Sequence, residues 1–416
     1  MNSTITYLKR IANAWQNSNL MLRILIGIVL GVSCALLFPG INGIAILGLL
    51  FVSSLKAIAP ILVAVLVTSS VAKARKGLGN RFKTVLLLYI STTLIAAILA
   101  VFASHLFPVK VVLTNITGAN NTAPGALGDV FRNIAQETMS NPITAIANAN
   151  YLSILFWAII LGLALKKVAS AQTIDTIHEW AEAVSQVVQW IIQCAPFGIL
   201  GLVYSSVSES GLEIFTTYGK LLLLLVSCML TVSLILNPIL IGSLLKRNPY
   251  PLVFRCLKES AINAFFTRSS AANIPVNMAL CKRMGLDEDF YSVSIPLGST
   301  INMDGAAITI TVMTLATCNT LGIETSLGSS LLLSILATLG ACGASGVAGG
   351  SLLLIPMACS LFGINNDIAM QVVAVGFIIG VVQDSVETAL NSSGDAMFTI
   401  AAEWHEKIKR GENIKM

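Results

Sequence analysis

Asn302-Met303-Asp304-Gly305 lies within an apolar stretch, 290–318, that is long enough to cross a membrane. A second polar group, Asn391-Ser392-Ser393-Gly394-Asp395, interrupts the last apolar stretch in the same way. An Asp at the centre of a membrane helix costs about 2.5–3.5 kcal/mol to insert, so an acid there is kept for a reason. Asn and Asp beside Gly, twice, predict oxygen ligands and a loosened helix whose carbonyls can bind a cation. A purely structural hydrogen bond between helices is the alternative, and the duplication argues against it.

The composition is that of a membrane protein. Of the 416 residues, 55% are hydrophobic and only 11% are charged, which excludes a soluble domain of this size. Eight apolar stretches have about the length that a helix needs to cross hydrocarbon; they lie at 20–38, 43–71, 82–106, 151–167, 186–207, 219–245, 290–318 and 367–402. We therefore predict an all-α polytopic protein embedded in a lipid bilayer.

Positive charges predict the topology. Lys and Arg gather at 9–10, 73–83, 166–167, 246–247 and 407–410. They are nearly absent from the alternate loops, which are 38–43, 107–150, 208–218 and 319–326. By the positive-inside rule both termini are cytoplasmic, so the net charge of +5 indicates topology and not affinity for nucleic acid. Eight crossings agree with this only if two further apolar segments, 252–283 and 327–362, each enter and leave on one side.

These two segments are expected to form re-entrant hairpins of opposite orientation. Segment 252–283 has basic residues at both ends and a middle, 267–275, that is too polar and broken to span. A hairpin that enters from the cytoplasm with its tip buried in protein satisfies both facts. Segment 327–362 mirrors it from the outside, with a glycine-rich tip at 343–351. A hairpin followed by a broken helix, twice and in opposite orientation, predicts an inverted repeat with a binding site at the membrane midplane.

The last apolar stretch carries a polar stripe. Asp384, Thr388, Asn391 and Asp395 follow the spacing i, i+4, i+7, i+11 and so share one helix face, with Glu387 at its edge. A stripe of that polarity must face a cavity or the protein interior.

These motifs resemble the dicarboxylate/amino acid:cation symporters, the glutamate-transporter family, over nearly the whole chain. Arg268-Ser269-Ser270 resembles the tip of that family's first hairpin, Gly298–Gly305 its broken seventh helix, and Asn391-Ser392-Ser393-Gly394-Asp395 the end of its eighth helix. Gly346-Val347-Ala348-Gly349-Gly350 resembles the second tip. The resemblance implies sodium-coupled uptake, by an elevator motion, in a homotrimer. A scaffold part at about 20–72 and 150–208 would hold a transport part at about 82–107 and 218–402.

The resemblance also implies site residues, position by position. One sodium site would use the carbonyls of Gly298, Asn302 and Asn391 with the Asp395 carboxylate. A second would use the carbonyls of Thr300, Ala341, Cys342 and Ala344. A third would use Tyr89, Thr92, Thr93, Asn302 and Asp304. The substrate would meet Ser270 and Asn391 with its carboxylate and Asp384 with its amino group, beside Glu387 and Thr388 and under a lid at Val347.

Two departures from the family pattern bear on the substrate. Members that carry acidic substrates have an Arg where this chain has Glu387, and a Thr where it has Ala306. Glu387 would repel an acidic side chain, whereas a short hydroxyl side chain could donate to Glu387 or Thr388. Alternatively, Glu387 is a coupling or proton-carrying acid, or pairs with Arg268. The combination resembles the bacterial members that take up L-serine and L-threonine with sodium through the cytoplasmic (inner) membrane.

Other functions remain as alternatives. A sodium symporter of broader range, carrying alanine, serine and cysteine, is the nearest. An intramembrane aspartyl protease would need two facing carboxylates that share a proton, but here each acid has an Asn in its own motif. A passive cation channel would explain the acids and not the paired hairpins. We expect a transporter and not an enzyme.

Overall fold

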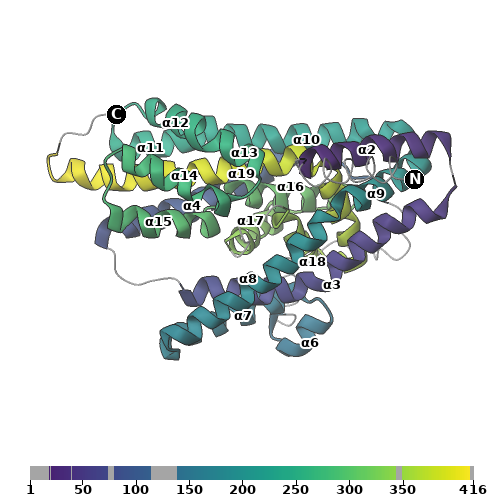
Figure 1. Cartoon of the computed structure of the whole chain (residues 1–416), viewed down its shortest axis with the longest axis horizontal. Helices are drawn as coiled ribbons and strands as arrows, with labels where there is room; N and C mark the ends of the chain where they lie inside the picture. The colour runs from purple at the N-terminus through teal and green to yellow at the C-terminus, as the bar shows by residue number, and fades with distance from the viewer. Residues whose placement is uncertain are drawn as a thin grey trace, which may run out of the picture.

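The computed structural model describes residues 18, 20–38, 40–73, 79–113, 138–342 and 349–412, and this part of the chain is helical without any β-strand. Figure 1 shows the helices, most of them aligned with the long axis of the molecule. They are α2 (Leu20–Leu37), α3 (Asn42–Lys73), α4 (Gly79–Leu106), α6 (Pro142–Ala147), α7 (Tyr151–Val168), α8 (Ala171–Gln193), α9 (Ala195–Ser210), α10 (Ile214–Thr231), α11 (Asn237–Leu245), α12 (Tyr250–Cys256), α13 (Ile262–Thr267), α14 (Ser270–Arg283), α15 (Glu288–Ile301), α16 (Asp304–Leu321), α17 (Leu327–Ala341), α18 (Ile355–Ser360) and α19 (Asn366–Lys409).

The helices have the properties of a multi-pass membrane protein. Among the described residues, five helices are long and apolar enough to cross a membrane, and the bent pair α8–α9 would make a sixth. Large apolar side chains on their outer faces have no protein cover: Leu49 of α3, Leu87 of α4 and Leu223 of α10 are 65%, 70% and 68% exposed. Such exposure on many helices is expected where lipid, and not water, surrounds the fold.

The predicted helix at 186–207 is wrong in shape. The structure has α8 from Ala171 and α9 to Ser210, with a bend of 54° between them. Pro196 lies in the first turn of α9, where a proline is tolerated because no N–H is needed there. Inside one continuous helix the same proline would remove a backbone hydrogen bond and break the helix. The polar first half of α8 was not predicted, because α8 is amphipathic and buries only a narrow face.

The backbone is interrupted at the first polar motif and continuous at the second. The chain is non-helical at Asn302 and Met303, between α15 and α16, so the predicted break of the seventh helix is confirmed. The last helix is not broken, contrary to the prediction, since α19 continues through residues 391–395. Its polar side chains bond sideways or back to the helix, as Ser393 Oγ does to the Ala389 carbonyl (2.7 Å), and leave the backbone hydrogen bonds intact.

The first hairpin segment reverses direction within two residues. Arg268 adopts a left-handed conformation (φ 53°) at the end of α13, and extended Ser269 caps α14 by accepting a hydrogen bond from the Ala272 N–H. The tip is therefore shorter than the predicted 267–275. In the second segment α17 contacts α18, but residues 343–348 of the predicted tip lie outside the described residues.

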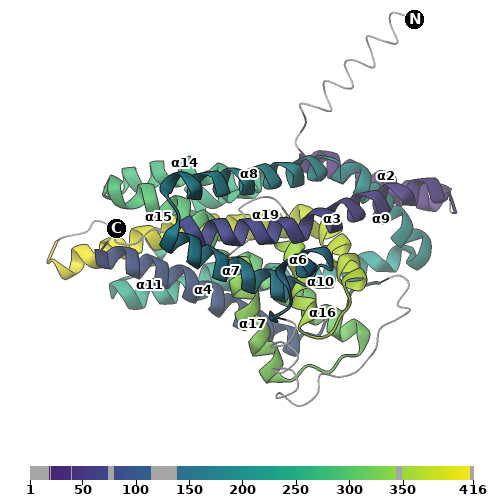
Figure 2. The ribbon, with the colours of Figure 1, turned by 90° about the horizontal axis from the view of Figure 1, so that it is seen from below.

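The helices pack in two groups. In one, α3 contacts α7, α8 and α9, and α2 packs on α9. In the other, α4 contacts α16 and α17, and α19 contacts α4 and every helix from α10 to α16. Figure 1 shows α3, α7 and α8 together on one side of α19, and Figure 2 shows the same groups turned by 90°. The polar motifs lie in the second group.

Candidate functional site

Asn302, at the break between α15 and α16, joins both polar motifs. Its Nδ2 donates to two acceptors on the continuous helix α19, the Asn391 carbonyl (3.0 Å) and Asp395 Oδ1 (3.0 Å). Gly394 permits this approach, because a Cβ atom there would lie 2.6 Å from Asn302 Nδ2. The structure thus brings Asn302, Asn391 and Asp395 together, and Gly298 adjoins them, since a Cβ on Gly298 would lie 2.9 Å from Asp395 Oδ1.

The Asp395 carboxylate has an oxygen available for a cation. Asp395 is fully buried, and its Oδ2 has no hydrogen-bond partner among the described residues. A buried carboxylate oxygen without a donor is costly unless it meets a positive charge. The residues of the first predicted sodium set therefore fit a bound cation.

A second group of oxygens gathers around Asp304. Thr93 Oγ1 donates to Asp304 Oδ1 (3.1 Å), and Thr92 Oγ1 lies 3.5 Å from Asn302 Oδ1. The Tyr89 carbonyl also accepts from Thr92 Oγ1 (3.1 Å) and from Thr93 Oγ1 (2.8 Å). All members of the third predicted set are thus neighbours, and all are buried.

Asn237 also reaches this second group, although sequence reasoning missed it. Its Nδ2 lies 3.5 Å from Asp304 Oδ2. Asn237 follows the π-helical turn Val232–Leu236, an irregularity that the apolar sequence did not predict.

The remaining predicted sodium set is only partly described. Cys342 follows α17 and lies against the end of α15, where its Sγ donates to the Ile301 carbonyl (3.3 Å). Ala341 is the last residue of α17 and Thr300 lies near the end of α15. Ala344 lies outside the described residues.

Asp384 is the point where both hairpin segments meet α19. Its Oδ2 accepts from Arg268 Nε (2.7 Å), and its Oδ1 accepts from the Gly349 N–H (3.1 Å). Arg268 is only 7% exposed and Asp384 only 3%. The buried ion pair of Arg268 is therefore with Asp384, and the alternative pairing of Arg268 with Glu387 is wrong.

Three of the other predicted substrate residues lie on α19 and at the start of α14. Asn391 Oδ1 accepts from the Gly305 N–H at the start of α16 (2.8 Å), and Thr388 lies one turn from Asp384 on α19. Ser270 is buried in the first turn of α14. Val347 lies outside the described residues.

Glu387 bonds a group of buried polar side chains that the sequence did not indicate. Its Oε2 accepts from Thr309 Oγ1 of α16 (2.7 Å), from Ser351 Oγ (3.0 Å) and from Gln383 Nε2 (2.5 Å). Gln383 could have been noticed, because it lies one turn before Glu387 on the same helix. Thr309 and Ser351 are distant in sequence, and no pattern links them to Glu387.

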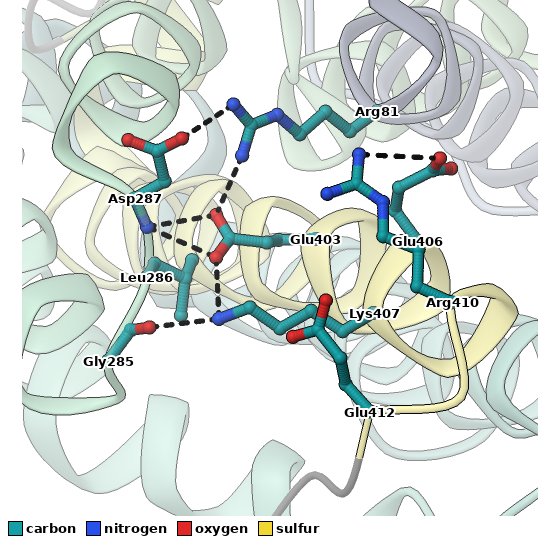
Figure 3. A pocket seen from close by; sticks show the side chains of 9 residues that line it. All are labelled: Arg81, Gly285, Leu286, Asp287, Glu403, Glu406, Lys407, Arg410 and Glu412. Atoms are coloured by element: carbon teal, nitrogen blue, oxygen red, sulfur yellow. Dashed lines mark hydrogen bonds and ion pairs between the residues drawn. The ribbon is translucent and has the colours of Figure 1, made fainter.

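A charged cluster outside the predicted site joins the first residues of α4, the turn before α15 and the end of α19. Figure 3 shows Arg81 between Asp287 and Glu403, with Lys407 on the other side of Glu403. Arg81 Nη2 donates to Asp287 Oδ2 (2.6 Å), and Lys407 Nζ to Glu403 Oε1 (2.8 Å). The hydrogen bond from Arg81 holds the pKa of Asp287 below its usual value.

A polytopic helical fold with a broken helix and buried acids and amides facing one another is typical of secondary transporters. The chain belongs to the sodium:dicarboxylate symporter family, whose family model matches residues 20–404. It is 55% identical, over 97% of its length and 94% of the relative, to the serine/threonine transporter SstT of Bifidobacterium adolescentis. It is 52% and 54% identical, over 95% of its length and 98% of each relative, to proteins of the same name from Streptococcus thermophilus and Streptococcus agalactiae.

Proposed function

We propose that this chain is a symporter that takes up L-serine and L-threonine together with sodium. The names of its relatives support this substrate, and membership of the family supports the coupling ion. The observation that carries the proposal is the buried carboxylate of Glu387, which three side-chain donors hold and which has no basic partner among the described residues.

The charges of Arg268, Asp384 and Glu387 favour binding of a neutral amino acid over an acidic one. Asp384 and Glu387 lie one turn apart on α19, and Arg268 pairs with Asp384. With both acids ionised, these three side chains sum to one negative charge, which a zwitterionic serine leaves unchanged. An aspartate would add a second negative charge beside Glu387, and like charges repel strongly where water is excluded.

Each part of the substrate has a partner in this proposal. The substrate carboxylate meets Ser270 and Asn391, and its amino group binds Asp384, which keeps lone pairs free beside Arg268 and the Gly349 N–H. The side-chain hydroxyl reaches Glu387 or Thr388, and Val347 belongs to the lid.

Sodium ions bind at three sets of oxygens in this proposal. The first is Gly298, Asn302, Asn391 and Asp395, and the unpartnered Oδ2 of Asp395 supports it. The third is Tyr89, Thr92, Thr93, Asn302 and Asp304, whose oxygens lie together in the structure. The second is Thr300, Ala341, Cys342 and Ala344, for which the closeness of Cys342 to the Ile301 carbonyl is the support.

The proposal extends to the whole chain. Eight membrane helices and two oppositely oriented re-entrant hairpins cross or enter the inner membrane of a bacterium, with both termini in the cytoplasm. A trimeric scaffold of residues 20–72 and 150–208 holds a transport part, 82–107 and 218–402, that moves as an elevator. The packing of α2, α3, α7, α8 and α9 as one group supports this division.

Competition for L-serine binding tests the role of Glu387. In wild type, L-threonine should displace labelled L-serine and L-aspartate should not. In Glu387→Arg serine affinity should fall, and aspartate should begin to compete, with Ala306→Thr added to restore the missing hydroxyl. If wild type, Glu387→Gln and Glu387→Arg all reject aspartate equally and Glu387→Gln keeps full serine affinity, Glu387 does not set selectivity. Displacement by L-alanine as strong as by L-threonine would favour the broader neutral range.

A further inference from the structure

The three donors to Glu387 converge on one of its two oxygens. Thr309 Oγ1, Ser351 Oγ and Gln383 Nε2 all donate to Oε2, and no other hydrogen bond to the carboxylate of Glu387 comes from the described residues. Glu387 is 6% exposed, and its three partners are at most 2% exposed. Three buried donors thus hold the carboxylate by one oxygen only.

The hydrogen bonds in this network run from Gln383, Thr309 and Ser351 toward Glu387. Gln383 Nε2 has two protons and uses them on Glu387 Oε2 and on Thr309 Oγ1 (2.8 Å). Because Thr309 accepts from Gln383, its own proton goes to Glu387, and the Ser351 proton does the same. Three donors to one oxygen require Oε2 to be an acceptor. In the ionised form of Glu387 the second oxygen, Oε1, is an acceptor as well, and it accepts a hydrogen bond from none of the described residues.

Backbone packing fixes the position of this carboxylate. A Cβ on Gly305 would lie 2.9 Å from both Cα and Cγ of Glu387, so α16 and α19 touch at this point. Thr309 lies one turn further along α16 and Gln383 one turn earlier on α19. Ser351 is the last residue of the predicted second tip, 343–351, and its hydrogen bond to Glu387 joins this part of the chain to α19.

We propose that Thr309, Gln383 and Ser351 are specificity-determining residues, which hold Glu387 by Oε2 so that Oε1 accepts the hydroxyl of serine or threonine. This rests on the proposed function and names the chemical group that the pocket selects. A substrate with the same backbone and no hydroxyl, L-alanine, leaves Oε1 without its donor. The three residues act through Glu387 and are positioning residues for it.

The test is the ratio of the L-alanine to the L-serine dissociation constant, measured on purified protein at saturating sodium. Thr309→Val, Gln383→Met and Ser351→Ala should each lower this ratio about tenfold by weakening serine binding, while alanine affinity stays nearly constant. Thr309→Ser keeps the hydroxyl and should keep the wild-type ratio. Thr311→Val is the matched control, because Thr311 is buried on the same helix and its Oγ1 has no hydrogen-bond partner among the described residues.

The outcomes separate this inference from the proposed function. An unchanged ratio in all three variants would overturn the inference, even if wild type binds serine with sodium. An equal loss of serine and alanine in the variants would indicate a merely structural role and would also overturn it. If wild type binds neither amino acid in sodium, the proposed function itself fails. Because the three variants lie in different elements, misfolding of one leaves the other two as tests.

Discussion

At the scale of single residues, the proposed substrate site depends on three buried charged side chains, Arg268, Asp384 and Glu387. Arg268 adopts the left-handed region that usually favours glycine, and its ion pair with Asp384 is buried. Removing one partner of such a pair commonly costs about 3–5 kcal/mol, because the other charge is left uncompensated. Asp384 thus serves the hairpin as well as the proposed substrate amino group.

The first prediction concerns Asp384. Asp384→Asn should weaken serine binding by about one to two orders of magnitude, since a charge-assisted hydrogen bond is worth about 1.5–3 kcal/mol. Equilibrium binding of labelled serine measures this. The double variant Arg268→Gln, Asp384→Asn removes the uncompensated charge, and serine binding should stay weak in it. Recovery to wild-type affinity in the double variant would show that Asp384 holds only the hairpin.

The second prediction concerns Asp395. Asp395→Asn should raise the sodium concentration for half-maximal serine binding about tenfold or more, because a buried charge–cation contact is worth more than the 1.4 kcal/mol that a factor of ten represents. A sodium titration of serine binding is the measurement, and Asp175→Asn, on the exposed face of α8, is the control. An unchanged titration would remove Asp395 from the sodium site.

Residue contacts of this kind could be predicted only in part. The Asn302 and Asp395 motifs were evident because polar residues within apolar stretches are rare, and the structure places them together. The hydrogen bonds to the Glu387 carboxylate were not evident from the sequence, because Thr309 precedes Glu387 by 78 positions and no helical or strand spacing relates them. The same is true of Arg268 and Asp384, which are 116 positions apart.

At the scale of elements, close helix contacts depend on glycine. Gly305→Ala should destabilise the protein by about 1–3 kcal/mol, the usual cost of overpacking, because the new methyl group meets the backbone of Glu387. It should also lower serine affinity by displacing the Asn391 contact to the Gly305 N–H. Thermal unfolding and serine binding measure both effects. Gly380→Ala on α19 is the control, since nothing lies within 4 Å of its added Cβ, and equal stability of both variants would contradict the packing argument.

The turn before α15 should make stability depend on pH. The pKa of Asp287 is lowered in the folded protein by the hydrogen bond from Arg81, so its contribution is present above the ordinary Asp pKa of about 3.9 and is lost as pH falls through the lowered value. Asp287→Asn should therefore lower the melting temperature at pH 7, with the difference from wild type disappearing in acid below about pH 4. A difference that persists unchanged in acid would exclude this ion pair as its source.

Elements were predicted where their sequences are apolar for a full membrane crossing. α3, α4 and α10–α11 lie within a few residues of the expected ranges for this reason. The first half of α8 was missed because its apolar positions form only one face. The break of α19 was expected from Asn391 and Gly394, but helical backbone persists there because the polar side chains bond laterally to α16 and back to α19 itself.

At the scale of the whole molecule, the proposed function requires that the binding of sodium and the binding of serine depend on each other. The oxygens around Asp304 and Asp395 share Asn302, and Asn391 contacts both this group and the start of α16 beside Glu387. Occupation by sodium would therefore order the backbone against which the substrate binds. Ligands that stabilise the same conformation bind cooperatively, so sodium and serine should raise each other's affinity.

Uptake of labelled L-serine into proteoliposomes tests the central claim most directly. The purified chain is reconstituted, and uptake is followed under an inward sodium gradient, with potassium replacing sodium, and under a proton gradient alone. The account predicts that serine accumulates above its external concentration only with the sodium gradient, and that Asp395→Asn abolishes this accumulation. Equal accumulation with potassium, or accumulation driven by the proton gradient alone, would contradict it.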